Sequence, residues 1–363
     1  MEEKKLKKII AILLSALFII ATLAGCSGGG TSGGETLKPG VNGEVNVCNW
    51  GEYIDESIFE DFEAQTGIKI NYNTAASNEV LYSLLKSGGA DFDVIIPSDY
   101  LISRLIDEGM IQKINFDNVP NAALIDEDYK NLEYDPTGEY SVAYMWGTVG
   151  IIYNTTMISD EITSWGSLFD PAYAGQLLMI DNPRDAFGVA LEYLGYSLNT
   201  TSEKELNEAY DLLVKQNDIR QGFVMDQIYD KMEGGEAAIS VYYAGDYISM
   251  YENNEDLAFV HPVEGANVFV DAMCILSDAK NKENAEAFIN FMCDTDIALR
   301  NMDVTGYVSA NGEAAEIYAE DLSDMEYEVL FPSDEYLDKC EVFLNLPEET
   351  LTLYNDLWIK LKT

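Results

Sequence analysis

The stretch EVNVCNWGEYIDESIFEDFEAQTGIKINYNTAASNEVLYSLLKSGGADFDVIIPSDYLISRLIDEGM, residues 44–110, decides the fold, because strand and helix patterns alternate in it three times. Short apolar or alternating runs at 45–50, 68–72 and 92–96 predict strands. Each is followed by a run with apolar residues at helical spacing, which a polar residue can cap: Asp55, then Ser77 or Asn78, then Ser98 or Asp99. Such successive units indicate a mostly parallel sheet covered by helices on both faces.

A second set of α/β patterns follows from residue 148 onward. It contains strand patterns at 148–153, 177–180, 237–243 and 268–276, and helices that begin near Ser202 and Asn281. Because no internal repeat and no long linker separates the two sets, we expect two lobes joined by crossing strands, with a ligand cleft at the crossing. The predicted lobes are residues 44–148 with 272–325, and residues 149–271 with 326–363.

The N-terminus has the layout of a secretory signal. Four lysines precede an apolar run at 9–23 that is short for a membrane span. The run ends in Leu23-Ala24-Gly25-Cys26, which resembles the lipobox of bacterial lipoproteins, where the cysteine is acylated with lipids such as palmitate and becomes the new N-terminus. We therefore predict a lipoprotein signal peptide at 1–25, a lipid anchor on Cys26 that holds the protein at the membrane without spanning it, and a flexible tether at 26–43. The alternative is an ordinary signal peptide with a chance cysteine.

The charge of the chain is extreme. The net charge is −43, and about −45 once residues 1–25 are removed, while 47% of the residues are hydrophobic, as in a packed globular protein. Such a surface repels nucleic acid and attracts small cations. Because acidic surfaces are common, the charge by itself only favours a cationic ligand.

Constellations typical of enzymes are missing from the sequence. His261 is the sole histidine, which excludes a histidine-based triad or a multi-histidine metal site. The GxSxG pattern occurs only within the Gly/Ser-rich segment at 25–34, without a predicted strand before it or a predicted helix after it, and a phosphate-binding glycine loop is missing. We therefore expect a protein that is not an enzyme and needs no cofactor. A pair of carboxylates could still serve glycoside hydrolysis, so a secreted carboxylate-dependent hydrolase is kept as an alternative. No CxxC motif occurs, and whether Cys293 pairs with Cys340 stays open.

The turns after the predicted strands combine aromatic side chains with carboxylates. They lie at 49–53, 97–100, 181–187 and 242–246, and the crossing strand adds Phe269 and Asp271 on one face. Carboxylates pair with ammonium groups through charge-assisted hydrogen bonds, and ring faces cover methylenes and attract the cation at roughly 0.5–2 kcal/mol each. Any one of these side chains could be core or a solvated cap, but together they predict a site for an aliphatic ammonium ligand. The pair Tyr242-Tyr243 leaves ferric iron as a second candidate ligand.

From about residue 44 to residue 362 the chain resembles the periplasmic spermidine/putrescine-binding protein family. The resemblance is carried by Asn-Trp-Gly-Glu-Tyr at 49–53, Asp-Val-Ile-Ile-Pro-Ser-Asp-Tyr at 93–100, Tyr-Met-Trp-Gly-Thr at 144–148, Phe-Val-Asp-Ala-Met at 269–273 and Thr-Gly-Tyr at 305–307, in matching order and spacing. It implies a type II periplasmic-binding-protein fold, whose two α/β lobes close on a polyamine. It further implies a monomer that delivers the ligand to an ABC permease without chemistry.

The resemblance also implies a role for each matching residue. Aromatic residues would enclose the aliphatic chain and polar residues would hold the amines: Trp50, Tyr243 and Phe269 as the box, Tyr53, Tyr100 and Tyr307 lining it or donating hydrogen bonds, Ser98 bonding an amine, Asp271 as the main anchor, Asp185 at the other end, Asp246 as an acid found in putrescine-preferring members, and Glu52 as an acidic position near the first motif.

Some positions depart from the family pattern. Asn182 stands where spermidine-preferring members carry an acid, Tyr243 and Phe269 stand where tryptophan is frequent, and Leu344 replaces a polar ligand-contacting residue. These departures concern the choice between polyamines, and together with Asp246 they predict that putrescine binds at least as tightly as spermidine.

Overall fold

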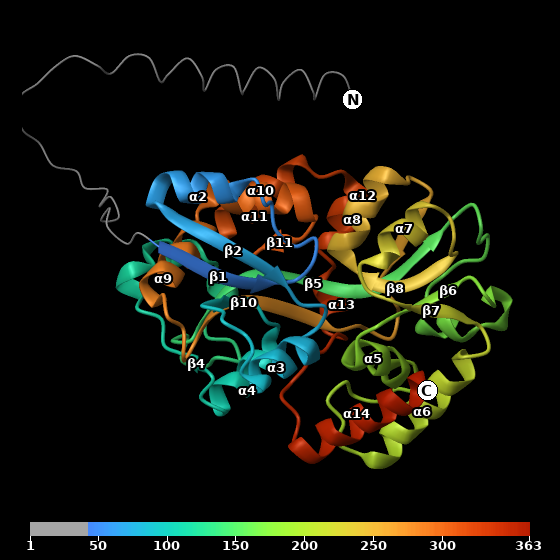
Figure 1. The fold of residues 1–363 in the computed structure, drawn as a ribbon. Coiled ribbons are helices and arrows are strands. Elements are labelled where there is room, and N and C mark those ends of the chain that lie inside the picture. The colour runs from blue at the N-terminus through green and yellow to red at the C-terminus, as the bar shows by residue number, and fades with distance from the viewer. Residues whose placement is uncertain (1–42) are drawn as a thin grey trace, which may run out of the picture. The chain divides into compact units, whose positions relative to one another are not determined.

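The computed structural model of the chain describes residues 43–363 and contains a mixed sheet with helices on both faces (Figure 1). The predicted signal peptide, Cys26 and nearly all of the predicted tether lie outside the described residues. The strands are β1 (Gly43–Asn49), β2 (Ile68–Thr74), β3 (Val94–Ile95), β4 (Ile111–Gln112), β5 (Ser141–Asn154), β6 (Leu177–Ile180), β7 (Arg220–Val224), β8 (Ile239–Tyr243), β9 (Leu257–Val260), β10 (Val268–Leu276) and β11 (Val308–Ser309).

The strand order is β2-β1-β3-β10-β5-β8-β6-β7, with β4 paired to β10 and with β9 and β11 paired to β5. Strands that belong to successive strand–helix units pair in parallel. In the first lobe β1 pairs with β2 and β3, and in the second β6 pairs with β7 and β8. The two central strands β5 and β10 run antiparallel to each other, so the sheet is mixed rather than mostly parallel as predicted.

Helices lie on both sides of these strands. In Figure 1, α2, α10 and α11 lie on one side of β1 and β2, and α3 and α4 lie on the other. The α-helices are α2 (Ile58–Thr66), α3 (Asn78–Ser87), α4 (Asp99–Asp107), α5 (Pro183–Tyr193), α6 (Glu203–Gln216), α7 (Gln227–Glu233), α8 (Ala244–Asn253), α9 (Lys282–Met292), α10 (Thr295–Thr305), α11 (Gly312–Asp321), α12 (Asp324–Leu330), α13 (Asp334–Leu337) and α14 (Glu348–Lys362). Short 3-10 turns are η1 (Phe116–Asn118), η2 (Pro120–Leu124), η3 (Glu127–Tyr129), η4 (Trp165–Phe169) and η5 (Pro171–Tyr173).

The start of α2 differs from the prediction that Asp55 caps it. The N-cap is Ser57, and Asp55 lies before it, accepting a hydrogen bond from the Ser57 N–H at 2.9 Å. Asp55 also accepts one from Arg300 Nε at 3.2 Å. The side chain is therefore used in a local turn and in an ion pair with α10, and the helix begins two residues later than expected.

Strand β5 passes between two halves of the sheet and gives the protein its two lobes. Its first half pairs with β10 as far as Thr148, and from Val149 onward it pairs with β8. Twelve of its fourteen residues are buried, so the crossing lies within the core. The lobe boundaries given above stay a prediction, because this exchange of partners fixes where one strand crosses and not where each lobe ends.

None of the four cysteines among the described residues forms a disulfide bond. Cys48, Cys274, Cys293 and Cys340 are all free thiols, so the structure has no disulfide between Cys293 and Cys340. Burial raises the pKa of the Cys293 thiol to about 12. Within residues 43–363, none of the helices combines the length and apolar character that a membrane span requires.

Candidate ligand-binding site

A cavity of about 720 Å³, counted with its open mouth, lies at the ends of β1, β3, β6 and β8, beside β10. Ten of the eleven predicted ligand-binding residues line it: Trp50, Tyr53, Ser98, Tyr100, Asp185, Tyr243, Asp246, Phe269, Asp271 and Tyr307. The remaining one, Glu52, is exposed and does not belong to the lining. The structure thus brings together residues from six distant segments of the chain, four of which follow the carboxyl ends of strands.

Asp271 marks one end of this cavity. It lies on β10 next to a bulge, in an isolated bridge with Ser98 at the start of α4. The residue is 3% exposed, and its Oδ1 atom has no hydrogen-bond partner. A buried carboxylate oxygen without a donor is costly, which makes it a candidate binding atom for a ligand donor.

Asp185 lies at another part of the cavity, in the first turn of α5. It is 5% exposed; its Oδ2 atom accepts a hydrogen bond from the Tyr243 hydroxyl at 2.8 Å, and its Oδ1 atom has no partner. The helix begins there because Asn182 caps it through the Arg184 N–H at 3.0 Å and Pro183 occupies its first position. Asn182 also lines the cavity.

The third acid, Asp246, has both oxygens occupied. It accepts hydrogen bonds from the Tyr229 hydroxyl at 2.5 Å and from the Tyr307 hydroxyl. Tyr307 precedes β11, which pairs with the first half of β5, whereas Asp246 is on α8 after β8. This acid therefore connects the two lobes through a tyrosine and closes one wall of the cavity.

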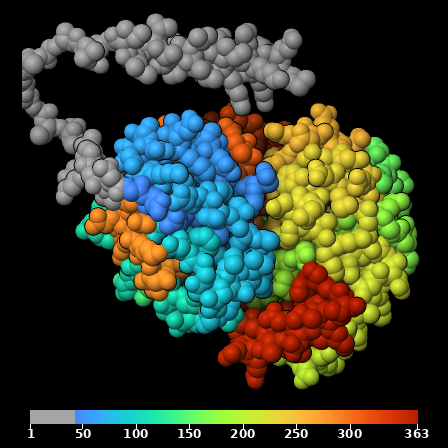
Figure 2. Space-filling view, viewed as in Figure 1, coloured from blue at the N-terminus to red at the C-terminus, as the bar shows by residue number. Residues whose placement is uncertain are grey.

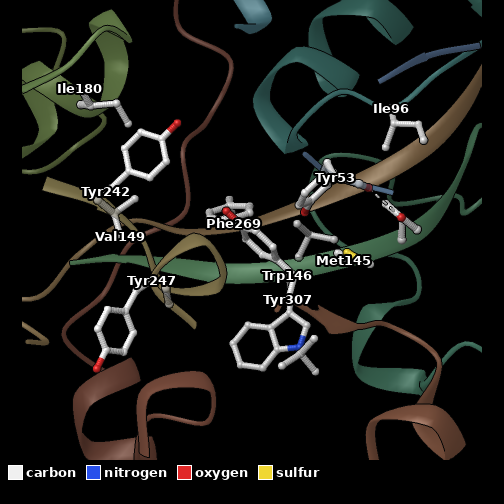
Figure 3. Packing of buried hydrophobic residues seen from close by; sticks show 14 of the residues in the cluster. Tyr53, Ile96, Met145, Trp146, Val149, Ile180, Tyr242, Tyr247, Phe269 and Tyr307 are labelled. Carbon is white, nitrogen blue, oxygen red and sulfur yellow. Dashed lines mark hydrogen bonds between the residues drawn. The ribbon is translucent and has the colours of Figure 1, made fainter. Parts of the chain in front are cut away.

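The aromatic rings form a continuous edge-to-face row. Ring centroids are 5.4 Å apart for Tyr243 and Phe269, 6.2 Å for Phe269 and Tyr307, and 4.7 Å for Tyr307 and Tyr53. Figure 3 shows Tyr53, Phe269 and Tyr307 close together beside β5 and β10. The row runs from the neighbour of Asp185 to the neighbourhood of Asp271, so apolar ring surface separates the two unpartnered carboxylate oxygens.

Several tyrosine hydroxyls give their proton to a carboxylate. Tyr100 donates to Glu79 Oε1 at 2.9 Å, Tyr243 donates to Asp185, and Tyr307 donates to Asp246. Each phenolic oxygen then has lone pairs left but no free O–H. These three phenolic oxygens can therefore accept from a ligand that carries N–H donors.

Burial shifts the pKa values of the acids in the cavity. It raises the pKa of Asp271 to about 6, although Ser98, Tyr53 and Trp50 lie near that carboxyl and lower it. Burial likewise raises the pKa of Asp246 to about 6 and that of Asp185 to about 7. A bound cation would offset the cost of ionising these acids.

Sequence reasoning missed other lining residues. Asp99 is 3% exposed and lines the cavity, although an acid at the start of a helix reads as a solvated cap. Its Oδ1 atom accepts from the Tyr100 N–H at 2.6 Å, and burial raises its pKa to about 8. Phe343 lines the cavity, whereas its neighbour Leu344 does not and instead accepts from Arg184 Nη1 at 3.2 Å through its carbonyl. The sequence held one signal for Asp99: it lies next to Ser98, which was predicted to bind the ligand.

The two lobes touch at the mouth of the cavity. The backbone of Gly51, after β1, approaches Asp226 at the start of α7 so closely that a Cβ there would lie 2.3 Å from Asp226 Oδ2. In Figure 2, blue and cyan atoms of the first lobe and yellow atoms of the second meet along a seam. A side chain at position 51 would displace the Asp226 carboxylate from its present position.

The tyrosine hydroxyls of the cavity are protonated in the metal-free protein. Burial and the Asp185 carboxylate raise the pKa of Tyr243 well above its ordinary value, and burial and Asp246 do the same for Tyr307. These surroundings favour the neutral phenol when no cation is bound. Among the described residues, no group of three or more His, Cys, Asp or Glu side chains is placed to hold a metal ion.

Comparison with known proteins agrees with this geometry. The chain matches the family model of bacterial extracellular solute-binding proteins over residues 57–326. It is 33% identical to the spermidine/putrescine-binding periplasmic protein of Escherichia coli, over 88% of this chain and 92% of that protein.

Two solved structures are similar to it. A Listeria monocytogenes structure assigned to a spermidine/putrescine ABC transporter superposes with a TM-score of 0.83 at 36% identity, covering 88% of this chain and 99% of that one. The TpPotD lipoprotein of Treponema pallidum superposes with a TM-score of 0.77 at 26% identity and the same two coverages. The two-lobed fold, the cavity and these relatives agree, and the chain belongs to the family of extracellular spermidine/putrescine-binding proteins of bacterial ABC transporters.

Proposed function

We propose that the protein captures a polyamine outside the cytoplasmic membrane and delivers it to an ABC permease, acting as a monomer and without catalysis. The observation that carries this proposal is the pair of unpartnered, buried carboxylate oxygens on Asp271 and Asp185, separated by a row of aromatic rings. Terminal ammonium groups would bind the oxygens, and the methylenes between them would lie against the rings. The alternatives of an iron carrier and a hydrolase have no comparable support.

Putrescine is the polyamine that the site favours. Asn182 places a neutral side chain in the lining near Asp185, and Phe343 adds a further apolar one. Asp246, with Tyr307 and Tyr229, closes a wall and keeps the box short. Asn182 therefore offers a third amine no negative charge at its position beside Asp185.

We expect calorimetric titration at one fixed salt concentration to show putrescine binding at least as tightly as spermidine. A thermal-shift panel with spermine, amino acids and ferric iron completes the comparison, since any ligand that binds the folded state raises its melting temperature. A tenfold preference for spermidine would contradict the assignment to putrescine, and a shift with iron alone would contradict the polyamine function.

Closure of the two lobes would follow ligand binding because Asp271 pairs with the first half of β5, whereas Asp185 follows β6, which belongs to the part of the sheet that pairs with its second half. A ligand that contacts both lobes stabilises the closed state by its differential affinity. The contact of Gly51 with Asp226 and the bond from Tyr307 to Asp246 are the interactions that closure would form.

The proposed location is the outer face of the membrane, with a lipid on Cys26. The sequence Leu23-Ala24-Gly25-Cys26 supports this anchor, and the relative in Treponema pallidum is described as a lipoprotein. One acyl chain binds a membrane only marginally, so stable anchoring needs more than one chain on the new N-terminus.

Changing Cys26 to Ala is expected to move the protein from the membrane fraction to the soluble fraction, because the lipid attachment point is lost. Fractionation followed by immunoblotting measures this, and Ser27→Ala, next to the same cleavage site, is the matched control that should stay anchored. A Cys26→Ala protein that remained in the membrane would mean that the apolar segment itself is the anchor.

A further inference from the structure

The acidic side chains that line the cavity differ in whether their oxygens are already used. They are Asp99, Asp185, Asp226, Asp246 and Asp271. Asp99 accepts from two backbone N–H groups and Asp246 from two tyrosine hydroxyls, so both oxygens of each carboxylate are occupied. Asp185 and Asp271 each have one oxygen without a partner, to which the proposed function assigns the two ammonium groups of a diamine. Asp226 is the acid that this assignment leaves without a role.

Asp226 differs from the other four acids in exposure and in hydrogen bonding. The others are at most 8% exposed, whereas Asp226 is an exposed residue. It stands at the N-cap of α7, but its backbone is helical and its side chain accepts no hydrogen bond from the helix. Within residues 43–363 its carboxylate has no ion pair and no hydrogen bond with another residue. The side chain therefore does not act as a helix cap, which is the common use of an acid at this position.

The Asp226 carboxylate lies at the mouth of the cavity, against the opposite lobe. A Cβ on Gly51 would be 2.3 Å from Asp226 Oδ2, so the carboxylate packs against the backbone that follows Trp50. Trp50 and Gly51 line the cavity themselves. Of the lining residues, Asp226 and Ala76 are the exposed ones, so this side of the cavity opens to solvent. The mouth thus carries a negative charge that no cation among the described residues balances.

A polyamine with a third amine finds no other free acid in the lining. Beside Asp185 the lining residue Asn182 is neutral, and the oxygens of Asp99 and Asp246 are occupied. The aminobutyl part of spermidine has the spacing of putrescine and would span the same two anchors. Its aminopropyl arm would then lead out through the mouth, where its ammonium group meets the free carboxylate of Asp226.

We propose that Asp226 binds the aminopropyl ammonium group of a triamine at the mouth of the cavity, while Asp185 and Asp271 bind the other two amines. The inference rests on the polyamine function proposed above and adds a subsite to it. The contribution of this subsite is modest, because an ion pair at an exposed position gains little and is screened by salt. It therefore permits triamine binding while putrescine still binds at least as tightly.

Asp226→Asn keeps the shape of the side chain and removes its charge. Calorimetric titration should show a loss of about fivefold in spermidine affinity and of less than about twofold in putrescine affinity. Asp230→Asn is the matched control, because it removes an equal charge from the next turn of α7, is exposed and lies outside the lining. This control should change the affinity for either ligand by less than about twofold.

The comparison of the two ligands decides between a contact and a general effect of charge. Equal losses for spermidine and putrescine in Asp226→Asn would mean that the acid acts on any cation, and would overturn the inference. Unchanged spermidine affinity would overturn it as well. If the unmodified protein bound neither polyamine, the proposed function itself would fail, which is a different result from either of these.

Spermidine that is acetylated on its aminopropyl nitrogen provides the sharper test, since it lacks the ammonium group assigned to Asp226. The unmodified protein should bind spermidine more tightly than this derivative. In Asp226→Asn the ratio of the two affinities should be about fivefold smaller, because the contact that distinguishes the ligands is gone. A high salt concentration should reduce the ratio in the unmodified protein too. An equal ratio in both proteins would place the aminopropyl ammonium away from Asp226 and overturn the inference.

Discussion

Replacing Asp271 with Asn is expected to weaken polyamine binding by about thirtyfold or more while the protein stays folded. The amide keeps the shape of the side chain but replaces a charged acceptor with a neutral group that directs N–H donors towards the ammonium. Losing one partner of a desolvated charge pair costs roughly 2–5 kcal/mol, which sets the size of the effect. Calorimetric titration with putrescine measures it, and affinity equal to that of the unmodified protein would place Asp271 outside the site.

The stability of the ligand-free protein provides the second readout for this variant. Burial raises the pKa of Asp271 to about 6, so the ionised form at neutral pH opposes folding and its replacement by Asn should not lower the melting temperature. Asp135 is the matched control: it is 2% exposed, but its carboxylate accepts from the Tyr140 N–H at 2.8 Å and the Ser141 N–H at 3.0 Å. Asp135→Asn should therefore lower the melting temperature and leave affinity unchanged.

The sequence predicted the positions of most strands but not the direction of the central ones. The alternation of patterns located the strands well: β6 and β10 have the predicted bounds, and β2 begins at the predicted residue. β7 and β9 were not predicted; β7 begins with the polar residues Arg220 and Gln221, which leave it without an apolar run of strand length. Strand direction was also missed at the centre, since periodicity does not reveal whether neighbours run parallel.

The candidate site was predicted where motifs follow strands and was incomplete elsewhere. Turns after parallel strands meet at one edge, so aromatic and acidic residues there could be grouped without knowledge of the structure. Asp99 and Asp226 lie at the beginnings of helices, where an acid normally faces solvent and interacts with the helix dipole. Their place at the cavity depends on how one lobe lies against the other, which no local pattern encodes.

Lowering the pH from 8 to 5 is expected to weaken polyamine binding on the order of a thousandfold if both anchor acids must ionise. The ligand needs carboxylates, whereas in the free protein burial raises the pKa of Asp185 to about 7 and that of Asp271 to about 6. At pH 5, ionising Asp185 costs about a factor of one hundred and ionising Asp271 about a factor of ten. Binding therefore releases protons in this range, and calorimetry in buffers of different ionisation enthalpy counts them.

Lowering the pH is expected to weaken polyamine binding but to stabilise the ligand-free protein. A carboxyl whose pKa is raised on folding gives stability that is present at low pH and is lost as the pH rises through the folded value, so the melting temperature without ligand should fall between about pH 5 and pH 8. His261 does not produce this dependence, because it lies outside the cavity lining and burial lowers its pKa.

Asp185→Asn is the matched variant for the binding experiment: its affinity for the polyamine should lose the step near pH 7 and keep the one near pH 6. A pH profile that stays equally steep would show that other groups release the protons, and a flat profile for the unmodified protein would show that the anchors are already ionised.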